Sequence, residues 1–100
     1  MTGRISINRV GLAEICKKYR ITRLALFGSV VRDDFGSDSD VDMLVEFEPG
    51  HVPGFFGLHR IEQEIAALFG NRRIDLLTFR SLNPHLRERI LAEAEVQYAA

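Results

Sequence analysis

Two aspartates separated by one residue, Asp40 and Asp42, have the type and spacing needed to bind a cation. The segment from Asp40 to Phe47 alternates polar and apolar positions, which predicts a strand. Alternate side chains of a strand share a face, and alpha carbons two residues apart are roughly 6 to 7 Å from each other, so both carboxylates can converge. Two such anions repel unless a cation lies between them, and oxygen ligands of this kind suit magnesium. The pair therefore predicts a magnesium site.

A magnesium site built on two carboxylates predicts a phosphate-bearing substrate, because Mg²⁺ usually completes its shell with waters and substrate phosphate oxygens. Gly28 and Ser29 follow an apolar segment and precede a predicted short helix over residues 30–35. Glycine lets backbone approach a ligand closely, serine adds a hydroxyl and an amide, and a helix N-terminus attracts phosphate. We expect this turn to hold the β and γ phosphates of a nucleoside triphosphate.

Asp75 lies in a third predicted strand, over residues 73–79, between apolar neighbours. There it could supply the third carboxylate of a two-metal site and accept the proton of an attacking hydroxyl. Each feature alone has an ordinary structural explanation: Gly28-Ser29 as a turn, the acidic segment around Asp40 as a solvated loop, and Asp75 as a residue at a sheet edge. Their joint occurrence favours the catalytic interpretation.

Other metal and phosphate motifs fail on the residues. An EF-hand loop beginning at Asp38 would need Gly and Glu where Met43 and Pro49 stand, and no Gly-Lys-Ser/Thr follows Gly28 as a P-loop requires. Cys16 is the only cysteine, which excludes an internal disulfide and a cysteine-clustered zinc site. The three histidines have no paired spacing, so we interpret them as surface or boundary residues: His51, His59 and His85.

Composition and charge predict one soluble, cytoplasmic domain spanning residues 1–100. The chain is 46% hydrophobic and 27% charged, as expected of a globular protein. Its net charge of -1, with 13 basic residues spread along the sequence, argues against non-specific nucleic-acid binding. The N-terminus lacks a hydrophobic signal core, and no apolar run approaches the roughly 20 residues of a membrane helix, so no membrane association is expected.

The periodicity of the chain predicts the order αβαβαβα, an α/β (α+β) fold with a small mixed sheet of about three strands flanked by helices. Ser6 or Asn8 could cap the first helix, and Asn83 with Pro84 marks the start of the last one. The predicted elements are a helix over 8–19, a strand over 22–27, a helix over 30–35, a strand over 40–47, a loop over 48–54, a helix over 58–68 closed by Gly70, a strand over 73–79 and a final helix from Pro84.

The segment GSVVRDDFGSDSDVD resembles the signature of the DNA polymerase β-like nucleotidyltransferase superfamily, in which Gly-Ser is followed after about ten residues by Asp-x-Asp. In size and element order the chain is similar to the minimal nucleotidyltransferases, or MNT proteins. The resemblance implies that Asp40 and Asp42 bind two Mg²⁺ ions and that Asp75 assists the second ion. Gly28, Ser29 and an arginine matching Arg32 would then contact the triphosphate. A solvated helix residue is the alternative interpretation of Arg32.

The same resemblance implies a function, because similar MNT proteins are often antitoxins that transfer AMP from ATP to a tyrosine of a HEPN-type toxin. Only 25 residues follow Asp75, so we expect a partner chain to supply the acceptor wall, as a hetero-oligomer would. Two alternatives stay open. One is a non-catalytic antitoxin that neutralises its partner by docking through apolar helix faces, and the other is a small-molecule nucleotidyltransferase of the aminoglycoside type.

Overall fold

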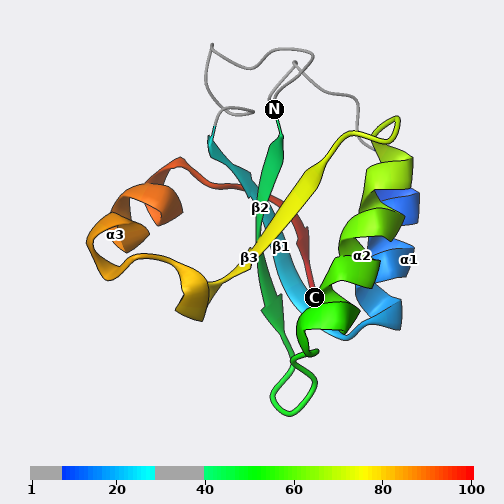
Figure 1. Ribbon diagram of the computed structural model, residues 1–100, viewed down its shortest axis with the longest axis horizontal. Helices are drawn as coiled ribbons and strands as arrows, with labels where there is room; N and C mark the ends of the chain where they lie inside the picture. Colours follow the sequence, from blue (N-terminus) through cyan, green and yellow to red (C-terminus); the bar gives the residue numbers. More distant parts are fainter. Residues whose placement is uncertain (1–7, 29–39) are drawn as a thin grey trace.

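The chain folds into a four-stranded sheet with helices on both faces. The structure is a computed structural model, and it describes residues 8–28 and 40–100. In Figure 1, α1 and α2 lie on one side of the sheet and α3 lies on the other. The elements are α1 (Arg9–Lys18), β1 (Ile21–Phe27), β2 (Val41–Phe47), α2 (Phe55–Leu68), β3 (Ile74–Thr78), a short 3₁₀ helix η2 (Phe79–Ser81), α3 (Pro84–Glu93) and β4 (Glu95–Ala99).

The sheet is mixed, with the strand order β3-β2-β1-β4. β1 runs antiparallel to both β2 and β4, whereas β2 and β3 are parallel. Two parallel neighbours need a crossover connection, and α2 supplies it. The amino ends of β2 and β3 and the carboxyl end of β1 therefore meet at one end of the sheet.

The larger core lies between the sheet and the two helices α1 and α2. Strand residues at alternate positions face these helices, as the period of two requires. The buried members include Leu24 and Leu26 of β1, Val41 and Met43 of β2, and Ile61 of α2. A smaller cluster on the opposite face joins Phe27, Leu44 and Leu82 to Ile90 and Ala94, which fixes α3 and the residue after it against the sheet.

Local capping sets the helix boundaries close to where the sequence predicts them. The Asn8 side chain accepts a hydrogen bond from the Gly11 N–H at 2.9 Å, so Asn8 caps α1; Ser6, the other candidate, lies outside the described residues. Asn83 accepts one from the His85 N–H at 2.9 Å, with Pro84 at the first helical position. These two predictions are confirmed.

The fold class is confirmed, but the strand count and the predicted order need correction. A fourth strand, β4, follows α3 and pairs with β1, placing Val96 beside Ala25 and Tyr98 beside Leu24. The helical spacing that ends at Ala94 does not continue, because Ala94 is already extended and closes the helix. The free edge of β1 then provides the hydrogen-bonding partner for this segment. The helix predicted over residues 30–35 lies outside the described residues.

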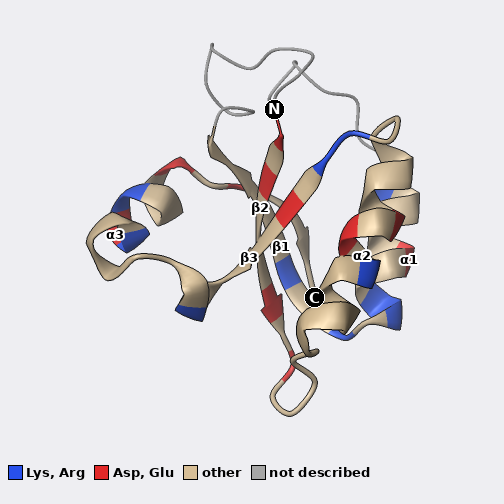
Figure 2. Cartoon of the chain, viewed as in Figure 1, with Lys and Arg blue, Asp and Glu red and all other residues tan. Residues whose placement is uncertain are grey.

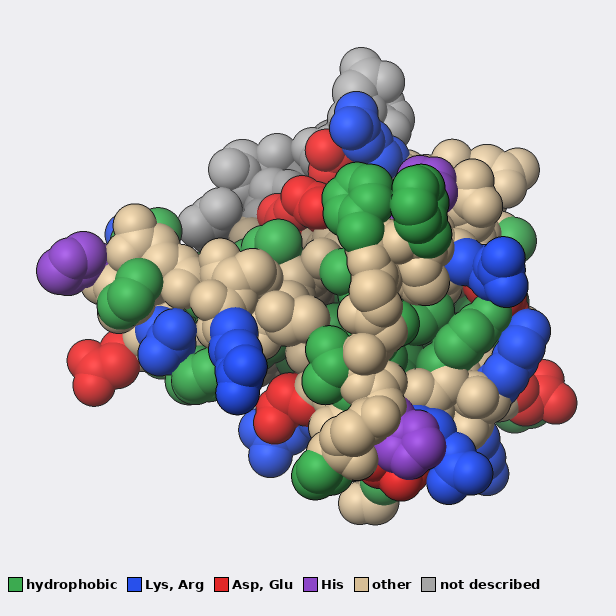
Figure 3. Space-filling model, turned by 60° about the horizontal axis from the view of Figure 1, so that its bottom comes forward, with side chains coloured by type: hydrophobic (Ala, Val, Ile, Leu, Met, Phe, Trp, Pro, Cys, Tyr) green, Lys and Arg blue, Asp and Glu red, His purple; other side chains and the backbone are tan. Residues whose placement is uncertain are grey.

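Several large apolar side chains remain exposed. Phe55 and Phe56 at the start of α2 are 82% and 86% exposed, and their rings meet edge to face with centroids 5.8 Å apart. Hydrophobic side chains lie among charged groups on the face shown in Figure 3. Among residues 8–28 and 40–100, no helix is both long and apolar enough to span a membrane.

Candidate active site

Two of the aspartates singled out in the sequence are direct neighbours in the sheet. The parallel register pairs Asp42 of β2 with Asp75 of β3, and the antiparallel register pairs Asp42 with Phe27 of β1. Adjacent strands lie about 4.8 Å apart, and residues directly opposite one another project to the same face. Figure 2 shows acidic segments side by side on β2 and β3. Asp40 stands just before β2, two residues from Asp42, and is exposed.

The carboxylates lie on the face of the sheet that α3 covers farther along the strands. Phe27 and Leu44, on this face, are buried in the smaller cluster. Phe27 is buried beside Asp42, Asp42 is half-buried and Asp75 is exposed, so burial on this face decreases from β1 toward the outer strand β3. Polar groups there remain accessible to a ligand.

Gly28 forms one wall of the site at the end of β1. Its φ of +77° lies in the left-handed region that side chains other than glycine rarely adopt. A Cβ added at Gly28 would come within 2.5 Å of Asp42 Oδ2. Because Gly28 has no side chain, the Asp42 carboxylate can occupy this space. The position of the carboxylate therefore depends on the backbone turn after β1.

The donor set fits a hard divalent cation. Asp40, Asp42 and Asp75 offer only carboxylate oxygens, the ligands that Mg²⁺ prefers, and Mg²⁺ commonly takes one or two protein carboxylates with phosphate oxygens completing the shell. Within residues 8–28 and 40–100, no three His, Cys, Asp or Glu side chains are gathered in a metal-binding arrangement. The set of three carboxylates, like the two-ion count, stays a prediction. Ser29 and Arg32 lie outside the described residues.

A comparison with protein families matches residues 10–96 to the model of the nucleotidyltransferase domain. This span includes both aspartate-bearing strands and Gly28. The chain belongs to the nucleotidyltransferase family. Because the match covers residues 10–96, we identify the chain as an enzyme of that family. A candidate minimal nucleotidyltransferase of solved structure also matches it, in agreement with the resemblance drawn from the sequence.

Curated relatives of this nucleotidyltransferase are named as protein adenylyltransferases. A candidate protein adenylyltransferase of Methanocaldococcus jannaschii is 38% identical over 80 residues, covering 80% of this chain and 83% of the relative. The protein adenylyltransferase MntA of Thermococcus cleftensis is 34% identical over 80 residues, covering 80% of this chain and 78% of the relative.

Solved structures share the fold. A candidate minimal nucleotidyltransferase is 36% identical with a TM-score of 0.71, and the match covers 87% of this chain and 86% of the other. A toxin-antitoxin structure with AMP-PNP is 17% identical with a TM-score of 0.73, covering 94% of this chain and 75% of the other. At that lower identity the likeness shows the fold alone.

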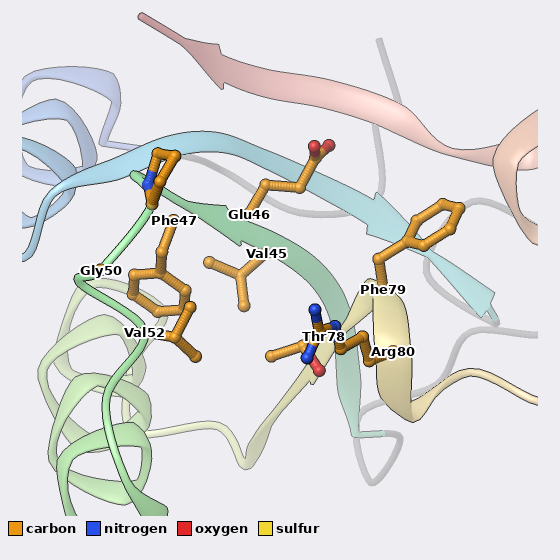
Figure 4. A pocket seen from close by; sticks show the side chains of 9 residues that line it. Val45, Glu46, Phe47, Gly50, Val52, Thr78, Phe79 and Arg80 are labelled. Carbon is orange, nitrogen blue, oxygen red and sulfur yellow. The ribbon is translucent and has the colours of Figure 1, made fainter.

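Two cavities flank this nucleotidyltransferase core in the described part of the chain. One, of about 330 Å³, lies between α2 and the start of β3, and Asp75 lines it. The other, of about 510 Å³, lies at the far ends of β2 and β3, where Phe47 and Val52 stand together and Glu46 points away from Val45 (Figure 4). Of these two cavities, the smaller is lined by Asp75 and so bears on the chemistry of the site.

Glu62 of α2 supports the site and was not predicted from the sequence. Its Oε2 accepts a hydrogen bond from the Leu76 N–H at 2.9 Å, on the outer edge of β3 and one residue past Asp75. Its Oε1 lies 3.4 Å from Nδ1 of His59. The apolar periodicity of α2 places Glu62 away from the core stripe, but it does not indicate which strand lies beside this helix. The sequence therefore held no signal for this contact.

Away from the site, one polar cluster joins the two helices of the larger core. Tyr19 donates a hydrogen bond to Glu64, and Lys18 Nζ lies 3.2 Å from Glu64 Oε1. The hydrogen bond from Tyr19 lowers the pKa of Glu64, and the bond to Glu64 raises the pKa of both Tyr19 and Lys18. The cluster couples α1 to α2 and has no part in the carboxylate site.

Proposed function

We propose that this nucleotidyltransferase transfers AMP from magnesium-bound ATP to a hydroxyl of a partner protein, a HEPN-type toxin, and thereby acts as its antitoxin. The observation that carries the proposal is the register that pairs Asp42 with Asp75 on one face of the sheet. Gly28 supports it, because a side chain there would collide with the Asp42 carboxylate. Such an arrangement suits a cation and a phosphate chain held close to backbone.

The proposed reaction is an in-line displacement at the α phosphorus. The acceptor oxygen forms a bond to that phosphorus, the bond to the oxygen bridging the α and β phosphates breaks, and pyrophosphate leaves with the electron pair. Magnesium bound by these carboxylates would neutralise charge on the phosphates and the leaving group. Asp40 and Asp42 provide oxygen ligands, Asp75 accepts the hydroxyl proton, and Ser29 and Arg32 contact the triphosphate.

The relatives and the surface support a protein partner. MntA of Thermococcus cleftensis, named a protein adenylyltransferase, supports a protein acceptor, and fold neighbours solved as toxin-antitoxin structures support a toxin. The exposed rings of Phe55 and Phe56 offer an apolar docking surface on α2, and large exposed aromatic side chains are common anchors of protein interfaces. We place the pair in the cytoplasm, where ATP is plentiful and the buried Cys16 thiol stays reduced.

Radiolabelled transfer tests the proposal. The chain is incubated with α-labelled ATP, magnesium and a HEPN-type protein that co-purifies with it, and intact masses are measured. We expect the partner to gain one or more AMP units, and Asp75→Asn to abolish the gain while the complex survives. Glu88→Gln, on the exposed side of α3, is the matched control and should retain transfer.

Two other outcomes would replace the proposal. A partner that is neutralised without any mass change, by the parent chain and by Asp75→Asn alike, would establish the non-catalytic docking function. Transfer to a small-molecule hydroxyl with no protein acceptor would establish the aminoglycoside-type activity.

A further inference from the structure

The cavity beside Asp75 is built from three consecutive parts of the chain. One face of α2 contributes His59, Glu62 and Gln63, the turn after α2 contributes Arg72 and Arg73, and β3 contributes Asp75. Its volume of about 330 Å³ is near the lower limit of ligand pockets, which run from roughly 300 to 1,000 Å³. This size suits one or two side chains of a polypeptide.

The backbone around the cavity is fixed. The Asn71 N–H donates to the Ala66 carbonyl at 2.8 Å, and Asn71 itself has a φ of +64°, which turns the chain sharply away from α2. The Arg73 carbonyl accepts the Val41 N–H at 2.9 Å, and Glu62 holds the Leu76 N–H from the other side. The start of β3 is thus held on both sides, so the cavity is pre-formed.

The lining of the cavity carries charges of both signs, and Arg73 is its exposed cation. The Glu62 carboxylate is already engaged by Leu76 and His59. The Arg73 side chain is exposed, and no residue of the described ranges pairs with its guanidinium. A guanidinium presents a planar set of donors that matches a carboxylate with two parallel hydrogen bonds. Figure 2 shows the basic segment directly before the acidic position of β3.

Asp75 connects the cavity to the carboxylate site, because it lines the cavity and pairs with Asp42 across the parallel register. We propose that the cavity is the acceptor subsite, in which Arg73 holds an Asp or Glu side chain of the acceptor polypeptide next to the reacting hydroxyl. The proposal rests on the proposed function, since it places the hydroxyl at Asp75, the group that would take its proton.

The test uses the full chain and synthetic tyrosine peptides labelled with fluorescein. One peptide carries Asp and Glu beside the tyrosine, and a second carries Asn and Gln at the same positions. Fluorescence anisotropy gives the Kd of each peptide without any catalysis, and labelled ATP with magnesium gives the KM for peptide and the KM for ATP separately. The variants are Arg73→Glu, Arg73→Lys and, as a matched charge reversal beyond the other end of β3, Arg80→Glu.

We expect the acidic peptide to bind more tightly than its neutral counterpart. Because hydrogen bonds to charged groups are stronger than those between neutral groups, and the substituted carboxylate repels the acidic peptide, Arg73→Glu should raise the Kd and KM of the acidic peptide at least tenfold. Arg73→Lys should restore part of the affinity, and Arg80→Glu should change it less than twofold. The KM for ATP should stay within twofold in all three variants.

Three results would overturn the subsite. Equal binding of the two peptides is one, equal effects of Arg73→Glu and Arg80→Glu are another, and a KM for ATP that rises with the KM for peptide would assign the cavity to the nucleotide. Selective binding of the acidic peptide that depends on Arg73 supports the subsite even if no peptide is modified, and in that case the transfer proposal alone would fail.

Discussion

Replacing Gly28 by alanine tests the site through one atom. The added Cβ would lie 2.5 Å from Asp42 Oδ2, so the carboxylate must move by roughly 1 Å to reach ordinary van der Waals separation. A displacement of about 1 Å in catalytic geometry can cost about 10²-fold in rate. We therefore expect Gly28→Ala to lower kcat/KM for AMP transfer about a hundredfold.

The same substitution also strains the backbone. A left-handed φ costs a residue with a Cβ roughly 1–2 kcal/mol, which for a chain of this size lowers the thermal midpoint by about 4–8 °C per kcal/mol. Gly50→Ala separates the two effects, because Gly50 has a φ of +81° but nothing lies within 4 Å of its added Cβ. Gly50→Ala should lose similar stability and keep its activity.

The assays are a thermal melt and initial rates of labelled transfer, measured at a temperature where all three proteins are folded. If Gly28→Ala and Gly50→Ala both retain full activity, the contact with Asp42 does not position the reacting groups, and the assignment of this turn to the active site is wrong. Loss of activity in both variants to the same degree would trace the effect to backbone strain instead.

Asp42→Asn should abolish transfer while the thermal midpoint stays the same or rises, because the half-buried carboxylate faces its neighbour Asp75; a variant that unfolds would argue for a structural role. Magnesium with ATP should raise the midpoint of the parent chain, since a ligand at 100 times its Kd stabilises the native state by about 2.7 kcal/mol, and coincident melts at saturation would contradict the magnesium site. Replacing both Phe55 and Phe56 by serine should weaken the partner complex at least tenfold in a titration without unfolding the chain, because both rings are exposed; unchanged affinity would place docking elsewhere. Burial raises the pKa of the Cys16 thiol from its ordinary value of 9.0 to about 11, so the native chain should resist alkylation at pH 8. Between about pH 9 and pH 11 only the unfolded thiol ionises, so the free energy of unfolding should fall as the pH rises through this range. Rapid alkylation of the folded chain would refute this.

The parts of the fold that depend on local chemistry could be predicted from the sequence. Asn8 and Asn83 accept hydrogen bonds within three residues of themselves, so the caps are visible in a short window. The alternation along β2 placed Asp42 opposite the core-facing residues, and the structure agrees. The sequence led us to expect Asp42 and Asp75 in one site, because both are carboxylates on predicted strands. That the two residues pair directly across β2 and β3 was learned from the structure.

The parts that depend on distant pairing could not be predicted. β4 is five residues long, and it becomes a strand because the edge of β1, some seventy positions earlier, is free to pair with it. The contact between Glu62 and the Leu76 N–H likewise depends on how a helix and a strand lie beside one another. Neither segment carries a local pattern that names its partner.

One face of the sheet determines how stably the chain folds, and the other carries the reacting carboxylates. The face under α1 and α2 holds most of the buried apolar residues, so random substitutions there change how much folded protein a cell keeps. The opposite face carries Asp42 and Asp75 beside a small cluster and an open end. Relatives that share this core can therefore come to modify different acceptors through substitutions on the open face, while the face under α1 and α2 keeps the chain folded. A laboratory evolution experiment that selects for a new acceptor should accumulate its substitutions on the open face.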